Sequence, residues 1–290
     1  MISIIITSFK ETGTIGRAIE CFLRQKLKDY EILVLAPDDG TLKAARRYSK
    51  RNKKIKLIKD SGRGKPSALN AAFQKAKGEI LILSDGDVYS GKGSVNLLVK
   101  KMEEEKAGAV SGRVIPINNR YEMFGYWAHV LTKGFHNLRM RESRKGKVIC
   151  SGYLYAVKSG IINKIPEGIL ADDAYISQKI IESGYASIYE PEAEVYVKYP
   201  NNLREWISQK KRTAGRFYQN KSAKTSKIKN FKHELIAALQ TLKEIKSLKE
   251  AFWFFLLAVM RGYIWFRVFF DFRLWKRDFK KTWQRIESSK

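Results

Sequence analysis

The stretch Ile80-Leu81-Ile82-Leu83-Ser84-Asp85-Gly86-Asp87 joins an apolar run to two carboxylates one residue apart. A short continuous apolar run is typical of a strand buried on both faces of a parallel sheet. Ligands of open α/β sheets bind at the carboxyl ends of the strands. Asp85 and Asp87 at such an edge can reach one hard cation together, or one cation and one sugar hydroxyl. Mg²⁺ takes few protein carboxylates and completes its shell with water and substrate phosphates.

Three similar apolar runs precede this one, at residues 2–6, 31–35 and 55–58. Helical patterns fill the gaps between the runs, at residues 15–23, 42–50 and 67–77. Thr14 is the expected N-cap of the first helix, and Gly78 the expected residue just past the end of the third. This alternation predicts an α/β fold with a Rossmann-like, doubly wound and mainly parallel sheet.

The pattern is looser beyond residue 90. Residues 118–144 are rich in aromatic residues and arginine, and they predict no definite element. The strands expected in this part lie at residues 109–115, 148–157, 186–190 and 194–198. The helices expected here lie at residues 95–105, at Asp172–Glu182 with Gly184 after it, and at residues 203–218. A linker at 219–230 and amphipathic or hydrophobic C-terminal helices follow.

The net charge of +27 comes from 56 Lys and Arg against 29 Asp and Glu, and residues 201–290 hold 22 of the former against 7 of the latter. Such an excess favours a polyanionic partner: nucleic acid, anionic lipid or phosphorylated substrates. A lysine-rich solvated surface is the alternative. Cys21 and Cys150 are too few for a disulfide framework, which favours a reducing, intracellular location. We expect no signal peptide, because the chain begins directly with a strand-like run.

Polar residues also follow the first two strands. Thr7, Ser8 and Glu11 come after the first, and Asp38 and Asp39 after the second. A nucleotide base and ribose would lie at these strand ends, where a carboxylate accepts hydrogen bonds from the ribose or from the imide of uracil. The alternative for the two aspartates is an ordinary acidic turn with an N-cap.

A glycine-punctuated loop at residues 61–70 opens the third helix. It is not a P-loop, because Lys59 stands where the leading glycine would be. Its flexible backbone and its two cations, Arg63 and Lys65, still suit a diphosphate at a helix N-terminus. A plain connecting loop with solvated bases is the alternative.

Two aspartates, Asp172 and Asp173, open a later helix. Acidic residues in a first turn gain about 0.3–1 kcal/mol each from the helix dipole, so capping explains them as well as a general base does. Ser151 and Gly152 precede this pair and would let an acceptor approach the backbone closely. Gln209 and Arg212 are three residues apart on the basic helix and can face one ligand, or they form a solvated basic face.

Together these motifs resemble the family 2 glycosyltransferases, inverting enzymes of the GT-A fold that use nucleotide-activated sugars. The resemblance covers about residues 1–215, and it rests on the order and spacing of the motifs rather than on any one of them. The matching segments are residues 7–11, 38–40, 64–70, 78–80, 84–88, 151–152 and 172–173, with Gln209 and Arg212.

The resemblance implies a role for each matching position. Asp38 or Asp39 would hold the nucleotide base, and Thr7, Ser8, Glu11 and Lys65 would lie near the nucleotide. Asp85 would contact the nucleotide sugar, and Asp87 would hold the divalent metal, Mg²⁺ or Mn²⁺, with Asp85 as its neighbour.

On the acceptor side, the resemblance makes Asp173 the catalytic base, with Asp172 as its acidic neighbour. Ser151, Gly152, Gln209 and Arg212 would lie near the acceptor or the diphosphate. The last two match the polar part of the Gln-x-x-Arg-Trp motif of processive synthases. The sequence departs from the family pattern at Ala36-Pro37, which displaces the usual acidic turn, and at Thr213, which replaces the tryptophan.

The expected organisation is a GT-A domain over residues 1–218, with a nucleotide-binding half (1–90) and an acceptor half (91–218), and a membrane-association region over 219–290. Residues 251–270 are long enough to span a bilayer, but Arg261 and Arg267 interrupt them. A central arginine costs about 2.5–3.5 kcal/mol, whereas helices of this composition lie in the interface plane. Basic residues at 227–249 and 273–281 would face anionic headgroups, at about 1 kcal/mol each.

We therefore expect a metal-dependent inverting glycosyltransferase at the cytoplasmic face of the membrane, with a UDP- or GDP-sugar donor and a lipid-linked or polysaccharide acceptor. A single span, or a soluble helix packed on the core, is the alternative for residues 251–270. The rival functions are a nucleic-acid-binding protein, a nucleotidyltransferase on a similar sheet and an inactive scaffold. Nucleic-acid binding leaves the paired aspartates unexplained, so no nucleic-acid partner is expected.

Overall fold

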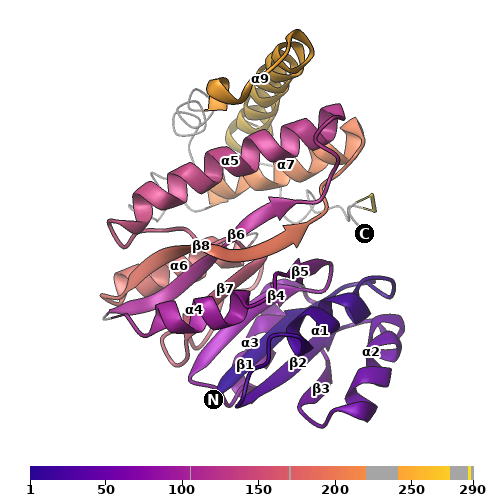
Figure 1. The fold of residues 1–290 in the computed structure, drawn as a ribbon, viewed down its shortest axis with the longest axis vertical. Coiled ribbons are helices and arrows are strands. Elements are labelled where there is room, and N and C mark those ends of the chain that lie inside the picture. The colour runs from indigo at the N-terminus through magenta and orange to yellow at the C-terminus, as the bar shows by residue number, and fades with distance from the viewer. Residues whose placement is uncertain (105, 170, 220–240, 275–286, 289–290) are drawn as a thin grey trace. The chain divides into compact units, whose positions relative to one another are not determined.

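The computed structural model describes residues 1–104, 106–169, 171–219, 241–274 and 287–288 (Figure 1). These residues form two compact units. The sheet unit comprises Met1–Ile115 and Arg139–Val197, and the helical unit comprises Pro116–Leu138 and Lys198–Ser289. The linker expected at residues 219–230 lies, but for its first residue, outside the described part of the chain. The boundary expected at residue 218 stays a prediction.

The sheet unit is built on one eight-stranded sheet with the strand order β3-β2-β1-β4-β7-β6-β8-β5. The strands are β1 (Ile2–Thr7), β2 (Tyr30–Ala36), β3 (Ile55–Lys59), β4 (Ile80–Asp85), β5 (Val88–Ser90), β6 (Ala107–Pro116), β7 (Leu154–Lys158) and β8 (Ala186–Val197). The helices between them are α1 (Ile15–Leu23), α2 (Asp39–Arg51), α3 (Lys65–Lys75), α4 (Ser94–Met102) and α6 (Asp172–Glu182).

The first four long strands are parallel, as the sequence predicts for a doubly wound sheet. β1 pairs with both β2 and β4, and β2 pairs with β3. Beyond β4 the sheet is mixed, because β7 runs antiparallel to both β4 and β6 and β5 runs antiparallel to β8. The register sets Thr7 directly opposite Asp85, so the predicted polar residues of β1 and β4 meet at one edge of the sheet.

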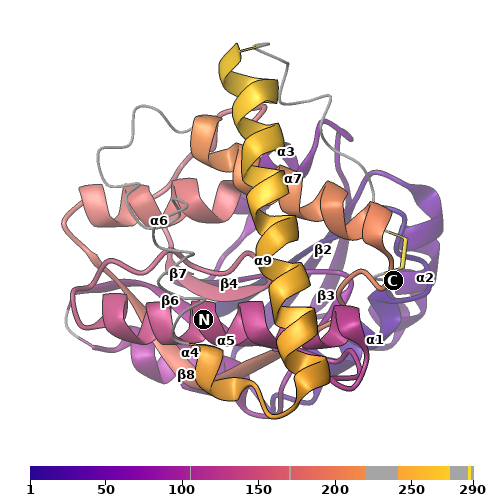
Figure 2. The ribbon, with the colours of Figure 1, turned by 90° about the horizontal axis from the view of Figure 1, so that it is seen from above.

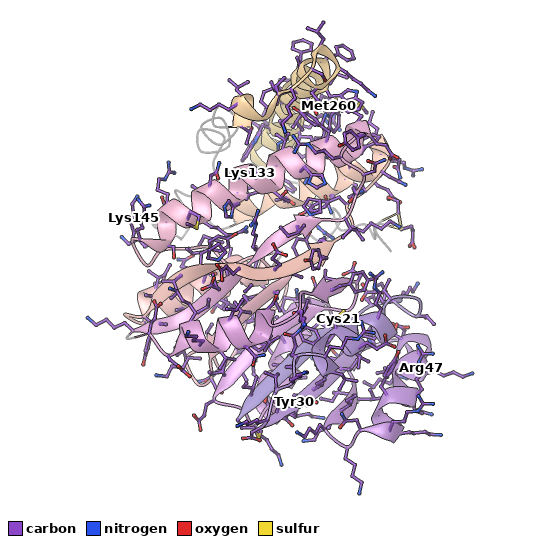
Figure 3. The ribbon with its side chains drawn as sticks, in the orientation of Figure 1. Cys21, Tyr30, Arg47, Lys133, Lys145 and Met260 are labelled. Atoms are coloured by element: carbon purple, nitrogen blue, oxygen red, sulfur yellow. The ribbon has the colours of Figure 1, made fainter. Side chains whose placement is uncertain are left out.

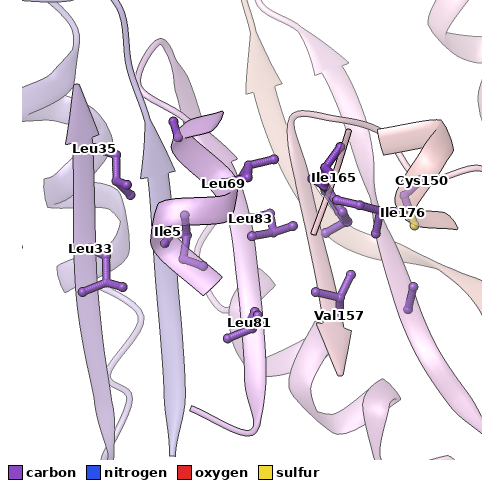
Figure 4. Close-up of a cluster of buried hydrophobic side chains, with 14 of the residues drawn as sticks. Ile5, Leu33, Leu35, Leu69, Leu81, Leu83, Cys150, Val157, Ile165 and Ile176 are labelled. Carbon is purple, nitrogen blue, oxygen red and sulfur yellow. The ribbon is translucent and has the colours of Figure 1, made fainter. Parts of the chain in front are cut away.

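One core of the sheet unit lies between the sheet and helices α3 and α6. Side chains from neighbouring strands point to one face, where Ile5, Leu33 and Leu83 pack together (Figure 4). Leu69 of α3 and Ile176 of α6 cover them, and both are fully buried. Full burial of one such side chain contributes about 1.5–3 kcal/mol. The same packing fixes the first turns of α3 and α6 at the carboxyl edge of the sheet.

The structure differs from the predicted elements in its middle part. Residues 118–144, for which no element is expected, contain the long helix α5 (Met123–Ser143). The two strands expected at 186–190 and 194–198 are one strand, β8, which continues through Pro191. The strand expected to start at residue 148 starts at Leu154, so the residues around Gly152 form a loop.

The two predicted cap residues differ in their outcome. Thr14 stands at the N-cap of α1 as predicted, although its side chain makes no capping hydrogen bond. The helix α3 ends at Lys75, so Gly78 does not cap it. Instead, a Cβ built on Gly78 would overlap the backbone of Ser3, and the N–H of Gly78 donates to Ser3 Oγ at 2.8 Å. The absence of a side chain at Gly78 therefore lets the backbone of β1 pass close to this residue. Gly184, with φ of 84°, follows α6 as predicted.

The helical unit combines the first part of α5 with α7 (Leu203–Gln219), the short 3-10 helix η2 (Leu242–Glu244), α9 (Leu248–Phe269) and the π-helical η3 (Phe270–Leu274). Helix α9 runs across α5 and α7 (Figure 2). The rings of Trp127 of α5 and Trp206 of α7 pack at an angle of 55° with centroids 4.7 Å apart, and Trp127 Nε1 donates to the carbonyl of Trp253 at 2.8 Å. These contacts hold the three helices together.

Basic side chains cover the surface of both units. Arg47 of α2, Lys133 of α5 and Lys145 after α5 are all exposed (Figure 3). Their distribution accords with the high net charge, which is not confined to one short segment.

Candidate active site

Residues that lie far apart in the sequence meet around Lys65, the first residue of α3. Its Nζ lies 2.6 Å from Asp85 Oδ1 and 3.5 Å from Asp172 Oδ2. The same Nζ donates to the carbonyl of Gly152 at 3.2 Å. Burial alone would lower the pKa of Lys65, but Asp172, Asp85 and Asp173 more than offset it and raise that pKa. Lys65 is therefore a fixed cation among three carboxylates.

Asp85 ends β4, and Thr7 ends the neighbouring strand β1. Thr7 Oγ1 donates to Asp85 Oδ1 at 3.2 Å. The Asp85 side chain is 24% exposed, so one carboxylate is held between a hydroxyl and the Lys65 ammonium while it remains open to solvent. A carboxylate fixed in this way can accept a further hydrogen bond from a ligand hydroxyl.

Asp173 lies in the first turn of α6, next to Asp172. Its residue exposure is 5%, which is unusual for a carboxylate whose sole task is capping. Asp173 Oδ1 accepts from the N–H of Ala174 at 2.9 Å, and a Cβ built on Gly152 would lie 3.4 Å from Asp173 Oδ2. Gly152 therefore leaves the space beside this carboxylate open. The helix dipole of α6 also stabilises the two aspartates at its N-terminus. Capping of α6 is therefore compatible with a chemical role for Asp173.

The turn between β4 and β5 contains Gly86 and Asp87. A Cβ on Gly86 would overlap Glu11 Oε2 and Ser8 Oγ, so a larger residue at this position would displace these two side chains. Ser8 Oγ donates to Glu11 Oε2 at 2.7 Å, and both residues are buried beneath the turn. The predicted nucleotide-side residues Ser8 and Glu11 thus support the turn that presents Asp87, whose side chain is partly exposed.

Asp38 is the N-cap of α2. Its Oδ1 accepts from the N–H of Thr41 at 2.9 Å and from Thr41 Oγ1 at 2.7 Å. Its Oδ2 accepts at 2.8 Å from the N–H of Lys10, a residue with a left-handed φ of 53°. Burial would raise the pKa of Asp38, but these hydrogen bonds outweigh it and lower that pKa. Asp39 is exposed and pairs with Lys59 at 2.8 Å.

Asp85 and Asp87 fit a divalent cation by their chemistry. Both supply carboxylate oxygens at one turn, and Mg²⁺ needs few protein ligands when a substrate supplies phosphate oxygens. In the described part of the chain there is no group of three or more His, Cys, Asp or Glu side chains arranged to hold a metal alone. The pair is therefore suited to a metal that arrives with a phosphorylated ligand.

The remaining predicted residues divide between the two units. Ser151 is buried in the sheet unit, where its N–H donates to Ser111 Oγ at 2.9 Å. Gln209 and Arg212 lie on α7 in the helical unit, and Gln209 is buried. The sheet unit thus brings together Thr7, Lys65, Asp85, Gly152, Asp172 and Asp173, whereas the Gln209 and Arg212 pair belongs to the other unit.

The sequence does not mark Tyr155, which has the pattern of an ordinary strand residue. It lies on β7 opposite Leu83 and is fully buried. Its hydroxyl has no hydrogen-bond partner among the described residues. Burial, together with the nearby Asp172 and Asp173, raises the pKa of Tyr155. No pattern of period or spacing marks such a residue, because its position depends on where α6 packs.

The family model "Glycosyl transferase family 2" matches residues 3–165, more than half of the chain. Among curated proteins, the chain is 26% identical over 227 residues to a "Probable glycosyltransferase YdaM" of Bacillus subtilis (strain 168). That alignment covers 73% of this chain and 54% of the relative. The chain spans about half or less of the length of the curated relatives it matches.

Two solved structures share the fold. The mannosyltransferase PcManGT from Pyrobaculum calidifontis, in complex with GDP-Man and Mn²⁺, superposes with a TM-score of 0.66 at 20% identity, over 95% of this chain and 87% of its own. The S. aureus protein TarS (residues 1–349), in complex with UDP-GlcNAc, gives a TM-score of 0.52 at 12% identity, over 94% and 91%. At these identities the likeness concerns the fold.

Proposed function

The chain belongs to glycosyl transferase family 2, and from that membership we propose an inverting, metal-dependent transfer of a sugar from a nucleoside diphosphate sugar to a lipid-linked or polysaccharide acceptor. That the protein is a glycosyltransferase of GT-A type follows from the family and the fold. The observation that carries the finer proposal is the cluster of Lys65 with Asp85 and Asp172, beside Asp173, at the carboxyl edge of the parallel strands.

The donor proposed is a UDP- or GDP-sugar. The two structural neighbours carry GDP-mannose and UDP-N-acetylglucosamine, so the shared fold accommodates a nucleoside diphosphate sugar with either base. In this chain Asp38 and Asp39 would lie at the base, with Lys10 and Thr41 holding Asp38 in place. Lys65 would face the diphosphate, because its cation lies at the N-terminus of α3.

In the proposed reaction, Asp173 takes the proton from the acceptor hydroxyl. The acceptor oxygen then forms a bond to the anomeric carbon while the bond from that carbon to the diphosphate oxygen breaks on the opposite side. This in-line displacement inverts the anomeric configuration, and the nucleoside diphosphate leaves. Burial of Asp173 beside Gly152 supports this role, because a hydroxyl can approach the carboxylate where no side chain intervenes. Lys65 stabilises the ionised carboxylates.

Asp87, with Asp85, would hold Mg²⁺ or Mn²⁺, and such a cation neutralises negative charge on a departing diphosphate. The Mn²⁺ bound to PcManGT supports this expectation. Lys65, 2.6 Å from Asp85, already places one positive charge at the same turn. Lys65 and the Asp85/Asp87 pair would therefore face the diphosphate together.

The acceptor would approach from the side of Ser151 and Gly152 in the sheet unit. The acceptor or diphosphate contacts expected for Gln209 and Arg212 stay predictions. We propose that the protein acts at the cytoplasmic face of the membrane on a membrane-bound acceptor. Helix α9 supports this location, because the segment Leu248–Phe272 is long and apolar enough to cross a bilayer, with a mean hydropathy of 1.4. Residues 1–218 would form the transferase domain and residues 219–290 the membrane-association region.

The proposal is tested by product analysis. The protein is incubated with UDP- and GDP-sugars, Mn²⁺ and a membrane extract, and the released nucleotide is identified. We expect nucleoside diphosphate, and NMR of the product should show inversion at the anomeric carbon. Release of pyrophosphate would instead identify a nucleotidyltransferase. Retention of configuration, or unchanged turnover after complete chelation of divalent metal, would contradict the inverting or the metal-dependent part.

A further inference from the structure

Helix α9 carries a continuous line of large apolar side chains on its exposed face. Their spacing of three or four residues places them along one side of the helix. Leu248, Phe255 and Phe266 are 91%, 62% and 60% exposed. The full line, which we call the apolar stripe, consists of Leu248, Phe252, Phe255, Val259, Tyr263, Phe266 and Phe269. Soluble proteins seldom expose a contiguous surface of this kind without a partner.

The opposite face of α9 is already occupied. Leu257, Ile264 and Val268 are buried in the core of the helical unit, together with Trp127 of α5 and Trp206 of α7. A helix that needed one apolar face to fold would be polar on the other side. Helix α9 is apolar on both sides, so folding accounts for one face and leaves the stripe unexplained.

The surroundings of the stripe are basic. Lys243, Lys246 and Lys249 are exposed just before or within the first turn of α9. Arg267 follows Phe266 on the helix itself, and Glu250 is the sole acidic residue of α9. Residues 201–290 as a whole hold 22 Lys and Arg against 7 Asp and Glu. A surface that combines exposed phenylalanines with flanking cations is complementary to anionic headgroups over an apolar interior.

We infer that α9 docks in the plane of an anionic bilayer, with the apolar stripe at the boundary of headgroups and acyl chains, and that it does not cross the bilayer. Length does not decide between the two, because 22 residues extend about 33 Å. The packing of α7 on the other face of α9 favours the in-plane helix over the span. A crossing α9 would carry the charged residues of α7 with it.

The charged residues in question lie close to α9. Lys211 of α7 pairs with Asp271 of η3 at 2.7 Å, and the Asp271 side chain is 2% exposed. Lys210 lies over the Trp206 ring, 5.9 Å from its centroid. Charged side chains at the bilayer centre cost about 2.5–3.5 kcal/mol each. An in-plane helix avoids this cost, because α7 and its lysines then stay on the aqueous side.

This inference rests on the membrane part of the proposed function and not on the transfer chemistry. Flotation of the full-length protein tests the docking, with vesicles of phosphatidylglycerol and phosphatidylcholine against vesicles of phosphatidylcholine alone. We expect binding to the anionic vesicles. The double variant Phe255→Ser/Phe266→Ser should lower the partition coefficient about a hundred-fold, since each buried phenylalanine contributes roughly ten-fold. The matched control is Tyr121→Ser, because Tyr121 is 80% exposed in the helical unit but off α9.

Several results would overturn the docking. One is equal flotation of the wild type and the double variant, and another is equal binding to both kinds of vesicle. A third is a wild-type dimer in light scattering that becomes monomeric in the double variant, because a second copy would then be what covers the stripe. Circular dichroism verifies that the double variant folds. Its transfer to a soluble acceptor should stay at the wild-type rate, which separates docking from chemistry.

A labelling experiment distinguishes the in-plane helix from a span. Lys249→Cys and Leu274→Cys are made separately in a Cys21→Ser background, since both positions are exposed and Cys150 is buried. Cells that express the variants yield inside-out vesicles and spheroplasts, which are treated with a membrane-impermeant maleimide. We expect both ends to react in inside-out vesicles and neither in spheroplasts. Reaction of one end from each side would show a span and overturn the inference, as would recovery of the protein in the soluble fraction alone.

Discussion

Asp173 combines features that a merely structural carboxylate does not need together. It is buried, it faces a glycine, and it belongs to the same cluster as Lys65. Burial of charge is costly unless the charge is compensated. This concentration of compensated carboxylates at one sheet edge is what a proton-accepting site requires.

The first prediction concerns the two aspartates with proposed chemical roles. Asp173→Asn removes the proton acceptor, and Asp87→Ala removes a metal ligand, so each should abolish sugar transfer while the circular dichroism spectrum stays that of the wild type. Turnover is measured as released nucleoside diphosphate. Glu182→Gln on the same helix α6 is the matched control, because Glu182 is exposed and pairs with Lys179. Survival of more than a few per cent of wild-type turnover in either aspartate variant would refute its role.

Lys65 supplies a second prediction at this scale. Lys65→Met removes the cation beside Asp85 and Asp172 and leaves neighbouring carboxylates that repel one another. Such repulsion favours protonation. The acid limb of the pH–rate profile should therefore move to higher pH, and turnover near neutrality should fall. Lys65→Arg keeps the charge and should leave the limb in place. If both variants showed the wild-type limb, Lys65 would not act on the base.

Gly86 makes a third prediction, about stability. Gly86→Ala places a methyl group against Ser8 and Glu11, beneath the turn between β4 and β5. Overpacking of this kind costs about 1–3 kcal/mol, and the midpoint of urea unfolding should fall accordingly. Gly13→Ala is the control, because nothing lies within 4 Å of a Cβ built there. An unchanged midpoint for Gly86→Ala would show that the turn accommodates the methyl group without a loss of stability.

At the scale of elements, the N-cap of α2 gives a prediction with a defined pH dependence. Asp38→Ala should cost about 0.5–2 kcal/mol at neutral pH, the usual value of a lost cap. The pKa of Asp38 is lowered in the folded protein. Its stabilisation is therefore complete above the unfolded value of about 3.9 and is lost as the pH falls through the folded value.

The measurement for this helix is urea unfolding of the wild type and Asp38→Ala at pH 7 and near pH 3. The difference between the two proteins should shrink at the lower pH. Asp39→Ala serves as the control, because Asp39 is exposed and its ion pair with Lys59 is a surface one. A pH-independent difference would show that the charge of Asp38 does not contribute.

The helices and strands with strong apolar patterns could be predicted from the sequence, and those with weak patterns could not. Strands β1 to β4 and helices α1 to α3 have buried, repetitive patterns, so the parallel half of the sheet could be predicted from the sequence. Helix α5 could not, because its aromatic and basic residues are distributed between two units and show no single apolar face. The sequence predicts two strands where β8 is one, and the strand continues through Pro191 although proline is rare within strands.

The candidate site was predictable where polar residues follow strong strands. Asp85 and Thr7 end β4 and β1, and their meeting follows from the register of the parallel pair. The contact of Lys65 with Asp172 depends on how α6 packs, and no local pattern encodes that distance. The burial of Ser8 and Glu11 was also unforeseen, since it results from the close approach that Gly86 permits. The roles proposed for these residues stay predictions.

At the scale of the whole molecule, the two units have different compositions and different proposed tasks. The sheet unit contains the carboxylate cluster, and the helical unit contains the apolar stripe. The net charge of +27 would draw the protein to any polyanion at low ionic strength. Charge alone therefore does not identify the partner. The apolar stripe favours an anionic membrane among these partners, because its aliphatic and aromatic side chains can all be buried in the acyl region beneath the headgroups.

Ligand binding provides a prediction for the intact protein. A donor that binds the native state alone raises the free energy of unfolding by RT ln(1 + [L]/Kd), about 2.7 kcal/mol at a hundred times Kd. A UDP- or GDP-sugar with Mn²⁺ should therefore raise the melting temperature by several degrees, and the same sugar with EDTA should raise it less. Free sugar without the nucleotide is the control. If no nucleotide sugar shifted the transition, the proposed donor class would be wrong.

The cation held by three carboxylates has a practical consequence for chemical modification. Acylating reagents consume neutral amines, and the raised pKa of Lys65 leaves it a smaller neutral fraction than the solvated lysines at mildly alkaline pH. Succinimidyl esters used for surface attachment or cross-linking should therefore spare Lys65 while they decorate the periphery. A heavily derivatised sample would keep its reaction centre chemically intact, and peptide mass spectrometry would report Lys65 among the last amines to be acylated.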